Sequence, residues 1–437
     1  MQLHRCARIL LGLVITALHA RSSPPQDDST PKPPVPAVWF GGRVALLADV
    51  DEDHVSELVV GAPRAEGGCG ALHVVSGATG KLLWHVVGAS PQAELGSVFA
   101  TGGDVDGDGV EDVVVREQKG ASARVEVLSG KDGRRLGRIE HASVTFVDQL
   151  LVVPDLDGDH AADVLIVERS SARMLAVSGR GRTTLHAGPS LSAMVLATLR
   201  RRANLILCAL GQDVDGDGVA DFACSYEVED EEYPPKLRST WLAILSGRAG
   251  YVVREACLRD RRIDSPCLSS GRDVDGDGAR DLLLSSADDV VELVSSATLR
   301  PVRSLWKGPS VPDLEGFGAS SAFVGDLDGD GASEVLVGCS DTLFPGGDYR
   351  AALYSGRGAF AGCVETTTYA HTRVFAGADF DRDGLPELVI GLPEIDEVWI
   401  IDGRSTRPFA KDVHDAGPRW WCQRVLTPKG AYVPAPK

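Results

Sequence analysis

The sequence lacks the features that would place it in several common classes of protein. Nothing after its first twenty residues resembles a transmembrane helix, which needs roughly 20 apolar residues in a row. No C-x-x-C pair indicates a zinc site, and no G-x-S-x-G or H-E-x-x-H motif indicates a hydrolase or a metalloprotease. No basic patch favours a nucleic acid or an anionic membrane. We therefore predict no nucleic-acid partner, no membrane span and no catalytic residues.

The composition is that of a globular, acidic protein with few aromatic residues. Of its 437 residues, 43% are apolar and 24% are charged, which argues against a disordered chain. The formal net charge is −18, from 62 acidic and 44 basic residues, and glycine occurs 49 times. Much of this acidity lies in one short repeated motif.

The first twenty residues have the pattern of a secretory signal peptide. Arg5 and Arg8 give a positive start, Ile9 to Leu18 form an apolar run, and Ala20 is a small residue suited to cleavage. We predict a signal peptide at residues 1–20 and an exported protein that is secreted, periplasmic or held at the cell surface. Residues 21–37 are rich in proline and are expected to form an extended linker.

Eight cysteines follow the predicted signal peptide. An even number permits disulfides in an exported chain, although spacing alone does not decide which cysteines pair. Free buried cysteines are the alternative.

One nine-residue pattern, D-x-D-x-D-x-x-x-[DE], occurs seven times, at intervals of 51 to 60 residues. The copies start at Asp49, Asp104, Asp155, Asp213, Asp273, Asp326 and Asp379. Each copy is followed by an apolar run and then by a second apolar run that ends in a small-residue turn, as at 74–77 and 127–130. Four short strands in a unit of this length are typical of a β-propeller blade, whereas the repeats of an open β-solenoid are usually shorter.

The repeats therefore predict an all-β, seven-bladed β-propeller of four-stranded blades over residues 38–410. Residues 411–437 are expected to form a C-terminal tail.

The repeated acidic residues need a counter-ion, because positions 1, 3, 5 and 9 put four carboxylates into one tight turn. Calcium takes 6–8 oxygen ligands, and alternating side chains in a curled loop can all face it. In the second copy, the backbone carbonyl of Val110 at position 7 is a further expected ligand. We predict up to seven calcium sites, each between the first and second strands of a blade. Their ligands are Asp49, Asp51, Asp53 and Glu57; Asp104, Asp106, Asp108 and Asp112; Asp155, Asp157, Asp159 and Asp163; Asp213, Asp215, Asp217 and Asp221; Asp273, Asp275, Asp277 and Asp281; Asp326, Asp328, Asp330 and Glu334; and Asp379, Asp381, Asp383 and Glu387.

Position 6 of the motif is glycine in five copies and histidine in two, at His54 and His160. A residue other than glycine with positive φ is uncommon, so we expect weaker calcium binding at the Asp49 and Asp155 sites. The two histidines are interpreted as turn residues, not as ligands. Position 12 is apolar in every copy and lies in a β-type run, which excludes an EF-hand, whose twelfth residue is a bidentate glutamate.

The chain resembles FG-GAP/VCBS repeat proteins, the group that includes the N-terminal propeller of integrin α chains. Phe40-Gly41 precedes the first acidic loop and Gly61-Ala62-Pro63 follows it, while Phe317-Gly318 and Gly391-Leu392-Pro393 echo the two halves later. The stretch from Ser76 to Trp84 is similar to bacterial exported repeats, planctomycete-type ones especially. The resemblance implies that partners dock on the face opposite the calcium loops. The expected contact loops are 65–70, 227–235, 309–317 and 342–348.

These features favour an extracellular binding or adhesion module for a protein or glycan partner, with calcium in a structural role. Two alternatives stay open. One is a propeller-based enzyme that acts on polysaccharide or phospholipid, which would need a catalytic cluster outside the repeated positions. The other is a passive structural component of the cell envelope.

Overall fold

The structure, a computed structural model, describes residues 37–120, 122–139, 147–168, 173–187, 205–229, 238–248, 250–259, 267–286, 289–305, 316–339, 349–365, 372–375, 377–406, 419–420, 424–428 and 432–434. The chain divides into Met1–Pro36 and Ala37–Lys437, and every described residue belongs to the second unit. The predicted signal peptide lies outside the described residues, as does nearly all of the predicted linker. Among the described residues, no helix is both long and apolar enough to cross a membrane.

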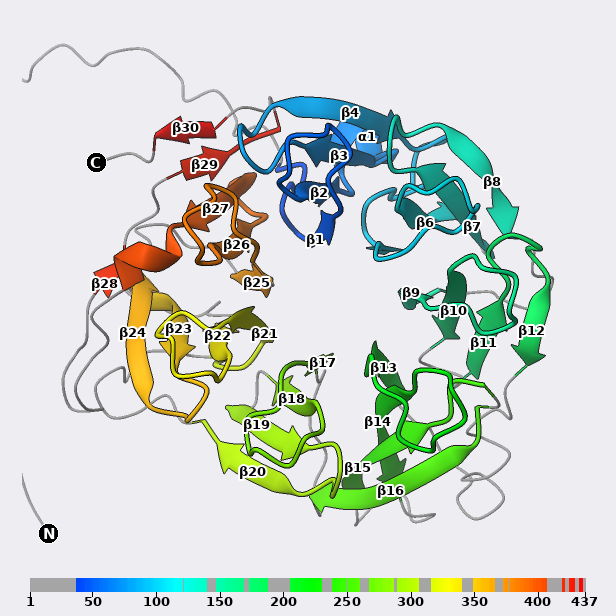
Figure 1. The fold of residues 1–437 in the computed structure, drawn as a ribbon. Helices are drawn as coiled ribbons and strands as arrows, with labels where there is room; N and C mark the ends of the chain where they lie inside the picture. Colours follow the sequence, from blue (N-terminus) through cyan, green and yellow to red (C-terminus); the bar gives the residue numbers. More distant parts are fainter. Residues whose placement is uncertain are drawn as a thin grey trace, which may run out of the picture. The chain divides into compact units, whose positions relative to one another are not determined.

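Seven sheets of four or five strands are arranged in a ring, which confirms the predicted all-β, seven-bladed propeller (Figure 1). Within each sheet the first four strands follow chain order, and the first strand lies nearest the centre of the ring.

Blades one to three consist of β1 (Val44–Leu47), β2 (Glu57–Ala62), β3 (Ala71–Val75) and β4 (Leu82–Val87); β5 (Phe99–Ala100), β6 (Asp112–Lys119), β7 (Ser122–Ser129) and β8 (Arg135–Ile139); and β9 (Gln149–Val153), β10 (Asp163–Glu168), β11 (Arg173–Val177) and β12 (Thr184–Ala187). Blades four and five consist of β13 (Ile206–Ala209), β14 (Phe222–Glu229), β15 (Arg238–Leu245) and β16 (Val252–Arg259); and β17 (Cys267–Ser270), β18 (Asp281–Ser286), β19 (Val290–Ser295) and β20 (Pro301–Ser304). Blades six and seven consist of β21 (Ser320–Gly325), β22 (Glu334–Gly338), β23 (Tyr349–Tyr354), β24 (Phe360–Glu365) and β28 (Arg419–Trp420); and β25 (Arg373–Phe375), β26 (Leu388–Leu392), β27 (Glu397–Ile401), β29 (Arg424–Leu426) and β30 (Tyr432–Pro434). Two short helices, α1 (Ala65–Gly68) and the 3₁₀ helix η1 (Gly403–Thr406), follow β2 and β27.

Blade seven is completed by a strand from the C-terminal part of the chain. β29 pairs antiparallel with β27, and β30 pairs in turn with β29. β28 runs parallel to β24 at the outer edge of blade six. The propeller therefore extends past residue 410, where the sequence analysis ended it, because outer strands carry no acidic motif that marks them.

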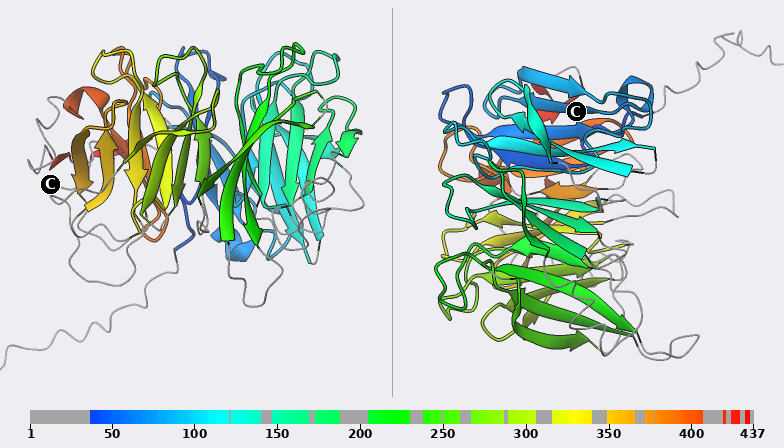
Figure 2. Two further views of the ribbon diagram at one scale, coloured as in Figure 1. Left: turned by 90° about the horizontal axis from the view of Figure 1, so that it is seen from below. Right: turned by 90° about the vertical axis from the view of Figure 1, so that its right-hand side faces the viewer.

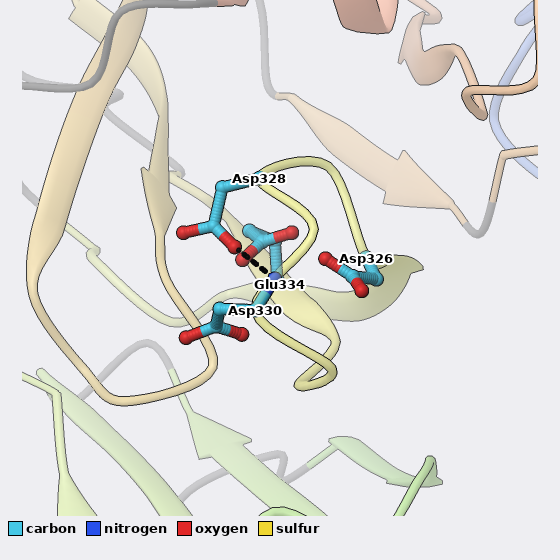
Figure 3. Close-up of side chains that lie close together, drawn as sticks. All are labelled: Asp326, Asp328, Asp330 and Glu334. Carbon is cyan, nitrogen blue, oxygen red and sulfur yellow. Dashed lines mark hydrogen bonds between the residues drawn. The ribbon is translucent and has the colours of Figure 1, made fainter.

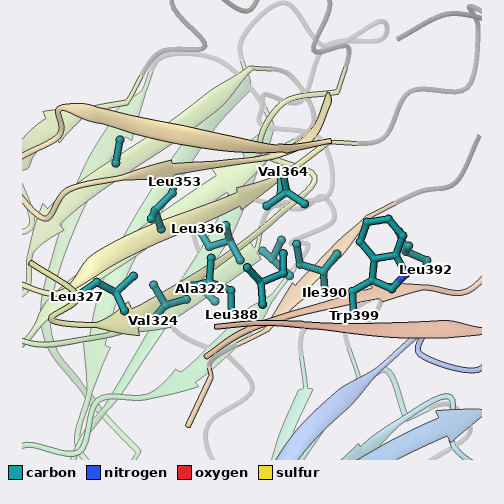
Figure 4. Packing of buried hydrophobic residues seen from close by; sticks show 14 of the residues in the cluster. Ala322, Val324, Leu327, Leu336, Leu353, Val364, Leu388, Ile390, Leu392 and Trp399 are labelled. Carbon is teal, nitrogen blue, oxygen red and sulfur yellow. The ribbon is translucent and has the colours of Figure 1, made fainter. Parts of the chain in front are cut away.

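Packing between neighbouring blades explains why the inner strands are so apolar. Every residue of β2, β10, β18, β22 and β26 is buried, since each of these strands is covered on both faces by adjacent sheets. Buried apolar residues form seven clusters, one at each junction between blades. Figure 4 shows the junction of blades six and seven, where Leu336 and Leu353 pack with Ile390 and Trp399. The ring thus distributes its hydrophobic core over seven interfaces.

The junction of blades one and seven closes the ring. The carboxylate of Asp396 accepts hydrogen bonds from the backbone N–H groups of Val38 and Phe40, both at 3.1 Å. Phe40 is buried in the apolar cluster of this junction, which also contains Leu426 of β29. Residues from both ends of the described chain therefore hold the last blade to the first.

The FG and GAP elements of the sequence meet in the structure. The N–H of Gly41, in the Phe-Gly pair, donates to the carbonyl of Gly61 at 3.1 Å. Gly318, in the second Phe-Gly pair, makes the same bond to Gly338 at 3.1 Å. Both glycines have positive φ, 86° and 94°, a conformation that glycine adopts without strain. The repeated dipeptide therefore has a repeated structural role at the entrance to a blade.

Candidate metal sites

The acidic motifs occupy equivalent places in all seven blades. Each lies in the connection from the first strand to the second, and its ninth residue is at or next to the start of the second strand. The first strands run in the same direction along the axis of the ring, so the seven connections gather at one end of it (Figures 1 and 2). The predicted placement of the loops is thus confirmed, whereas the bound ion stays a prediction.

The carboxylates at positions 1, 3 and 5 stabilise the turn of each loop by accepting hydrogen bonds from backbone N–H groups. In blade two, Asp104 accepts a hydrogen bond from the N–H of Gly109 at 2.7 Å. Asp106 accepts one from Asp108 at 3.1 Å, and Asp108 accepts one from Val110 at 2.9 Å. Equivalent bonds recur in the other blades. These side chain-to-backbone turns fix the loop backbone and direct the carboxylates toward one another.

In blade six, all four acids of the motif converge. One oxygen from each of Asp326, Asp328, Asp330 and Glu334 lies within 4.8 Å of the other three (Figure 3). Groups of three acids meet the same limit in other blades. They include Asp49, Asp51 and Asp53; Asp104, Asp106 and Asp108; Asp155, Asp157 and Asp163; and Asp213, Asp215 and Asp221. Such close carboxylates repel one another unless a cation or protons neutralise them.

The ninth acid differs from the other three because it is fully buried in all seven blades, with 0% of its surface exposed. In blade three, one oxygen of Asp163 accepts the N–H of Leu156 at position 2, at 2.7 Å. The other oxygen accepts the N–H of Gly179, in the turn between the third and fourth strands, at 3.0 Å. This carboxylate therefore joins the loop, the second strand and the turn.

Burial raises the pKa of these ninth-position acids. It raises the pKa of Glu57, Asp112, Glu334 and Glu387 to about 7, and that of Asp163 and Asp281 to about 6. The pKa of Asp221 is raised for the same reason. Backbone N–H donors oppose the shift, and neighbouring aspartates add to it in most loops. Without a cation, these groups therefore ionise at a higher pH than exposed carboxyl groups do.

Two of the buried acids retain an oxygen without a hydrogen-bond partner among the described residues. They are Oδ1 of Asp281 in blade five and Oε1 of Glu334 in blade six. A buried carboxylate oxygen without a partner is costly, and a bound cation would satisfy it. The residues present therefore fit a hard cation.

The two histidine-bearing loops adopt the predicted backbone. His54 and His160 each have φ of 67°, in the left-handed region that glycine occupies in the other loops. Their side chains are 90% and 95% exposed, and each Nδ1 lies near Oδ2 of the first aspartate, at 3.6 Å from Asp49 and 4.0 Å from Asp155. Positive φ at position 6 is thus confirmed.

An arginine that the sequence analysis missed follows the Ser-Gly or Asp-Gly turn in four blades. Arg357 Nε lies 2.8 Å from Asp330 Oδ2, and Arg404 Nε lies 2.8 Å from Asp383 Oδ2. Arg180 and Arg248 donate to the backbone carbonyl of the fifth-position aspartate in blades three and four. The repeated tripeptide Ser-Gly-Arg, at 178–180, 246–248 and 355–357, was the available signal.

The predicted partner loop at 65–70 follows the second strand of blade one, so it lies at the end of that sheet opposite the acidic loop. The loop at 65–70 is described and contains α1. The predicted loops at 227–235 and 309–317 lie mostly outside the described residues, and the loop at 342–348 lies wholly outside them. Next to α1, Trp39 is 36% exposed with φ of 63°, and the Arg64 guanidinium lies 3.7 Å from the centroid of its ring.

Comparisons with known proteins show the fold and nothing finer. No family model and no curated protein matches the chain. The structure is similar to that of BBS1N in complex with ARL6DN, soaked with mercury, with a TM-score of 0.50 and 10% identity over 82% of this chain and 96% of that one. It also resembles the C-terminal WD40 domain of Sif2, with a TM-score of 0.46 and 10% identity over 90% of this chain and 97% of that one. The seven four- or five-stranded sheets make the described chain a seven-bladed β-propeller, and its resemblance to FG-GAP/VCBS repeat proteins remains a prediction.

Proposed function

We propose that this chain is an exported, calcium-stabilised β-propeller that binds a protein or a glycan. The observation that carries the calcium assignment is the convergence of four carboxylates in blade six, each with an oxygen within 4.8 Å of the others. The same motif occupies the same connection in all seven blades. We therefore infer that the acidic loop of each repeat needs a cation.

Calcium suits this donor set better than other metals. Every side-chain donor is a carboxylate, and no nitrogen or sulfur ligand belongs to the motif. Oxygen donors select hard cations, and calcium accepts 6–8 of them in irregular geometry. When bound, calcium would neutralise the loop and join the first strand, the second strand and the following turn. Its role is structural, because binding only the folded loop stabilises the folded state.

The end of the ring opposite the acidic loops is the proposed binding face. Trp39 and Tyr251 are the two exposed large hydrophobic residues in the described part of the chain. Tyr251 lies at the acidic end, where its hydroxyl donates to Asp215 at 2.7 Å. Trp39 lies at the opposite end, with Arg64 over its ring. Tryptophan and arginine are the residue types that most often dominate binding interfaces.

A screen of glycans and surface proteins, with the full chain in millimolar calcium and again after chelation, tests this function. We expect a partner that binds in calcium, that loses affinity at least tenfold with Trp39→Ala, and that is retained by Tyr251→Ala, the matched control. Equal binding by both variants would place the partner elsewhere. Turnover of polysaccharide or phospholipid would favour the enzyme alternative, and failure to bind any ligand would favour a passive envelope component.

A further inference from the structure

The innermost strands of the seven blades line a cavity of about 730 Å³ along the axis of the ring. Its walls combine apolar residues, such as Phe375, with polar ones, such as Ser270 and Ser321. This volume falls within the range of about 300–1,000 Å³ that is usual for a small-molecule site. The size and the walls fit a small organic ligand.

The charged residues of this cavity all have one sign. Arg43, directly before β1, and Arg373, at the start of β25, both line it. Its described lining contains no aspartate or glutamate. Neither arginine forms an ion pair or a side-chain hydrogen bond with a described residue. Because both stand at the beginning of a first strand, they lie at the end of the cavity opposite the acidic loops.

Arg43 is held in surroundings that disfavour an unpaired cation. Its guanidinium lies 5.5 Å from the centroid of the Phe99 ring, and burial lowers the pKa of Arg43. Arg43 is half-buried, so its guanidinium is only partly removed from water, and no acidic residue of the described lining supplies a counter-charge. Nearby, Oγ of the lining residue Ser269 is buried with no hydrogen-bond partner among the described residues.

We propose that the axial cavity binds a small organic oxyanion, a molecule with a carboxylate or sulfonate group on an apolar body, and that Arg43 and Arg373 supply its counter-charge. Guanidinium groups match the geometry of such oxyanions and form charge-assisted hydrogen bonds to them. The apolar residues of the walls hold the body of the ligand. The site is independent of the proposed calcium loops, which lie at the other end of the ring.

Calorimetric titration of the calcium-loaded full chain with benzoate tests the site, with sodium sulfate and the neutral benzyl alcohol as parallel probes. We expect benzoate to bind at least tenfold more tightly than benzyl alcohol. Arg43→Gln and Arg373→Gln should each weaken benzoate binding by about tenfold or more, whereas Arg134→Gln, at an exposed turn outside the cavity, should not. Sulfate binding as tight as benzoate binding would overturn the organic part of the proposal. Equal binding of benzoate and benzyl alcohol, or unchanged binding by Arg43→Gln, would overturn the site.

Thermal melts without any added oxyanion give a second readout. If Arg43 is an unpaired cation kept for a ligand, Arg43→Gln should melt at the same temperature as the unchanged chain or above it. Added benzoate should raise the melting temperature of the unchanged chain by more than that of the variant. A lower melting temperature for Arg43→Gln without ligand, together with an undiminished benzoate shift, would show that Arg43 is structural.

Discussion

Blades five and six contain closely matched acidic loops but differ in what faces the fifth-position aspartate. Both loops read D-x-D-G-D-G-A, and both end in a buried acid with an unpartnered oxygen. In blade six, the Arg357 guanidinium contacts Asp330 at 2.8 Å. In blade five, the equivalent turn residue is Ala297, and the hydroxyl of Ser295 donates to Asp277 at 3.0 Å.

The chain's own arginines therefore supply part of the positive charge that the acidic loops need, and they supply it in some blades but not in others. Arg357 is 70% exposed, so its pairing with Asp330 is screened by water and contributes only about 0.5 kcal/mol. It cannot neutralise four converging carboxylates. The turn of blade five offers its acidic loop no arginine. We therefore expect the stability of blade five to depend more on a bound cation.

Replacing the ninth-position acid with its neutral amide is the strongest test of the difference between blades five and six, because it should change stability the most. Asp281→Asn removes a carboxylate ligand and should lower the free energy of unfolding by about 2 kcal/mol in calcium. In EDTA the variant should instead have a higher free energy of unfolding than the unchanged chain, because the substitution also removes a buried charge that lacks a full set of partners. Denaturant unfolding in both conditions measures the two effects.

Two controls accompany this variant. Glu334→Gln in blade six should show the same reversal with a smaller gain in EDTA, because Arg357 already offsets part of the repulsion. Asp132→Asn, at an exposed turn outside the loops, should change neither value. Equal destabilisation of Asp281→Asn with and without calcium would contradict the role of this acid as a ligand.

The pH dependence of stability should change direction with calcium. Burial raises the pKa of Asp281 from 3.8 to about 6 and that of Glu334 from 4.5 to about 7. Between the unfolded and folded pKa values, the calcium-free folded chain binds more protons than the unfolded chain, so its stability should fall as pH rises through roughly 4 to 7. In calcium the ion favours the ionised acids, so stability should instead fall as pH decreases. Melting curves across this range, with EDTA or with calcium, check both slopes, and identical slopes would contradict the prediction.

Exchanging the turn residues should give the smallest effect. Arg357→Ala should lower stability in EDTA by about 0.5 kcal/mol and have little effect in calcium, and Ala297→Arg should raise the stability of the calcium-free protein by a similar amount. Denaturant unfolding at low salt measures these changes, since salt screens exposed ion pairs. A loss for Arg357→Ala that is equal in EDTA and calcium would show that the arginine acts through packing.

The repeated aspartates predicted much of the fold, because one motif marks the first two strands of every blade. They also predicted the left-handed backbone at His54 and His160, since the turn imposes it on whichever residue stands there. The outer strand β29 of blade seven was missed, because it lies outside the repeated motif and is recruited through pairing with β27.

The contacts of the arginines could not be predicted from local sequence patterns. Arg357 and its equivalents contact aspartates about 20 to 30 positions away, and only the hairpin between the second and third strands brings them together. Arg43 and Arg373 are 330 positions apart and share a cavity only after the ring closes. The spacing of these residues along the sequence therefore does not predict their contacts.

The most direct test of the account is the melting temperature of the full chain in millimolar calcium and after rigorous chelation, with magnesium alone as a control. Each site filled at a hundred times its dissociation constant adds about 2.7 kcal/mol, so loss of several sites should lower the melting temperature by roughly 10 °C or more. Re-addition of calcium should restore it, and magnesium should restore it only in part. An unchanged melting temperature after chelation would contradict calcium stabilisation of the propeller.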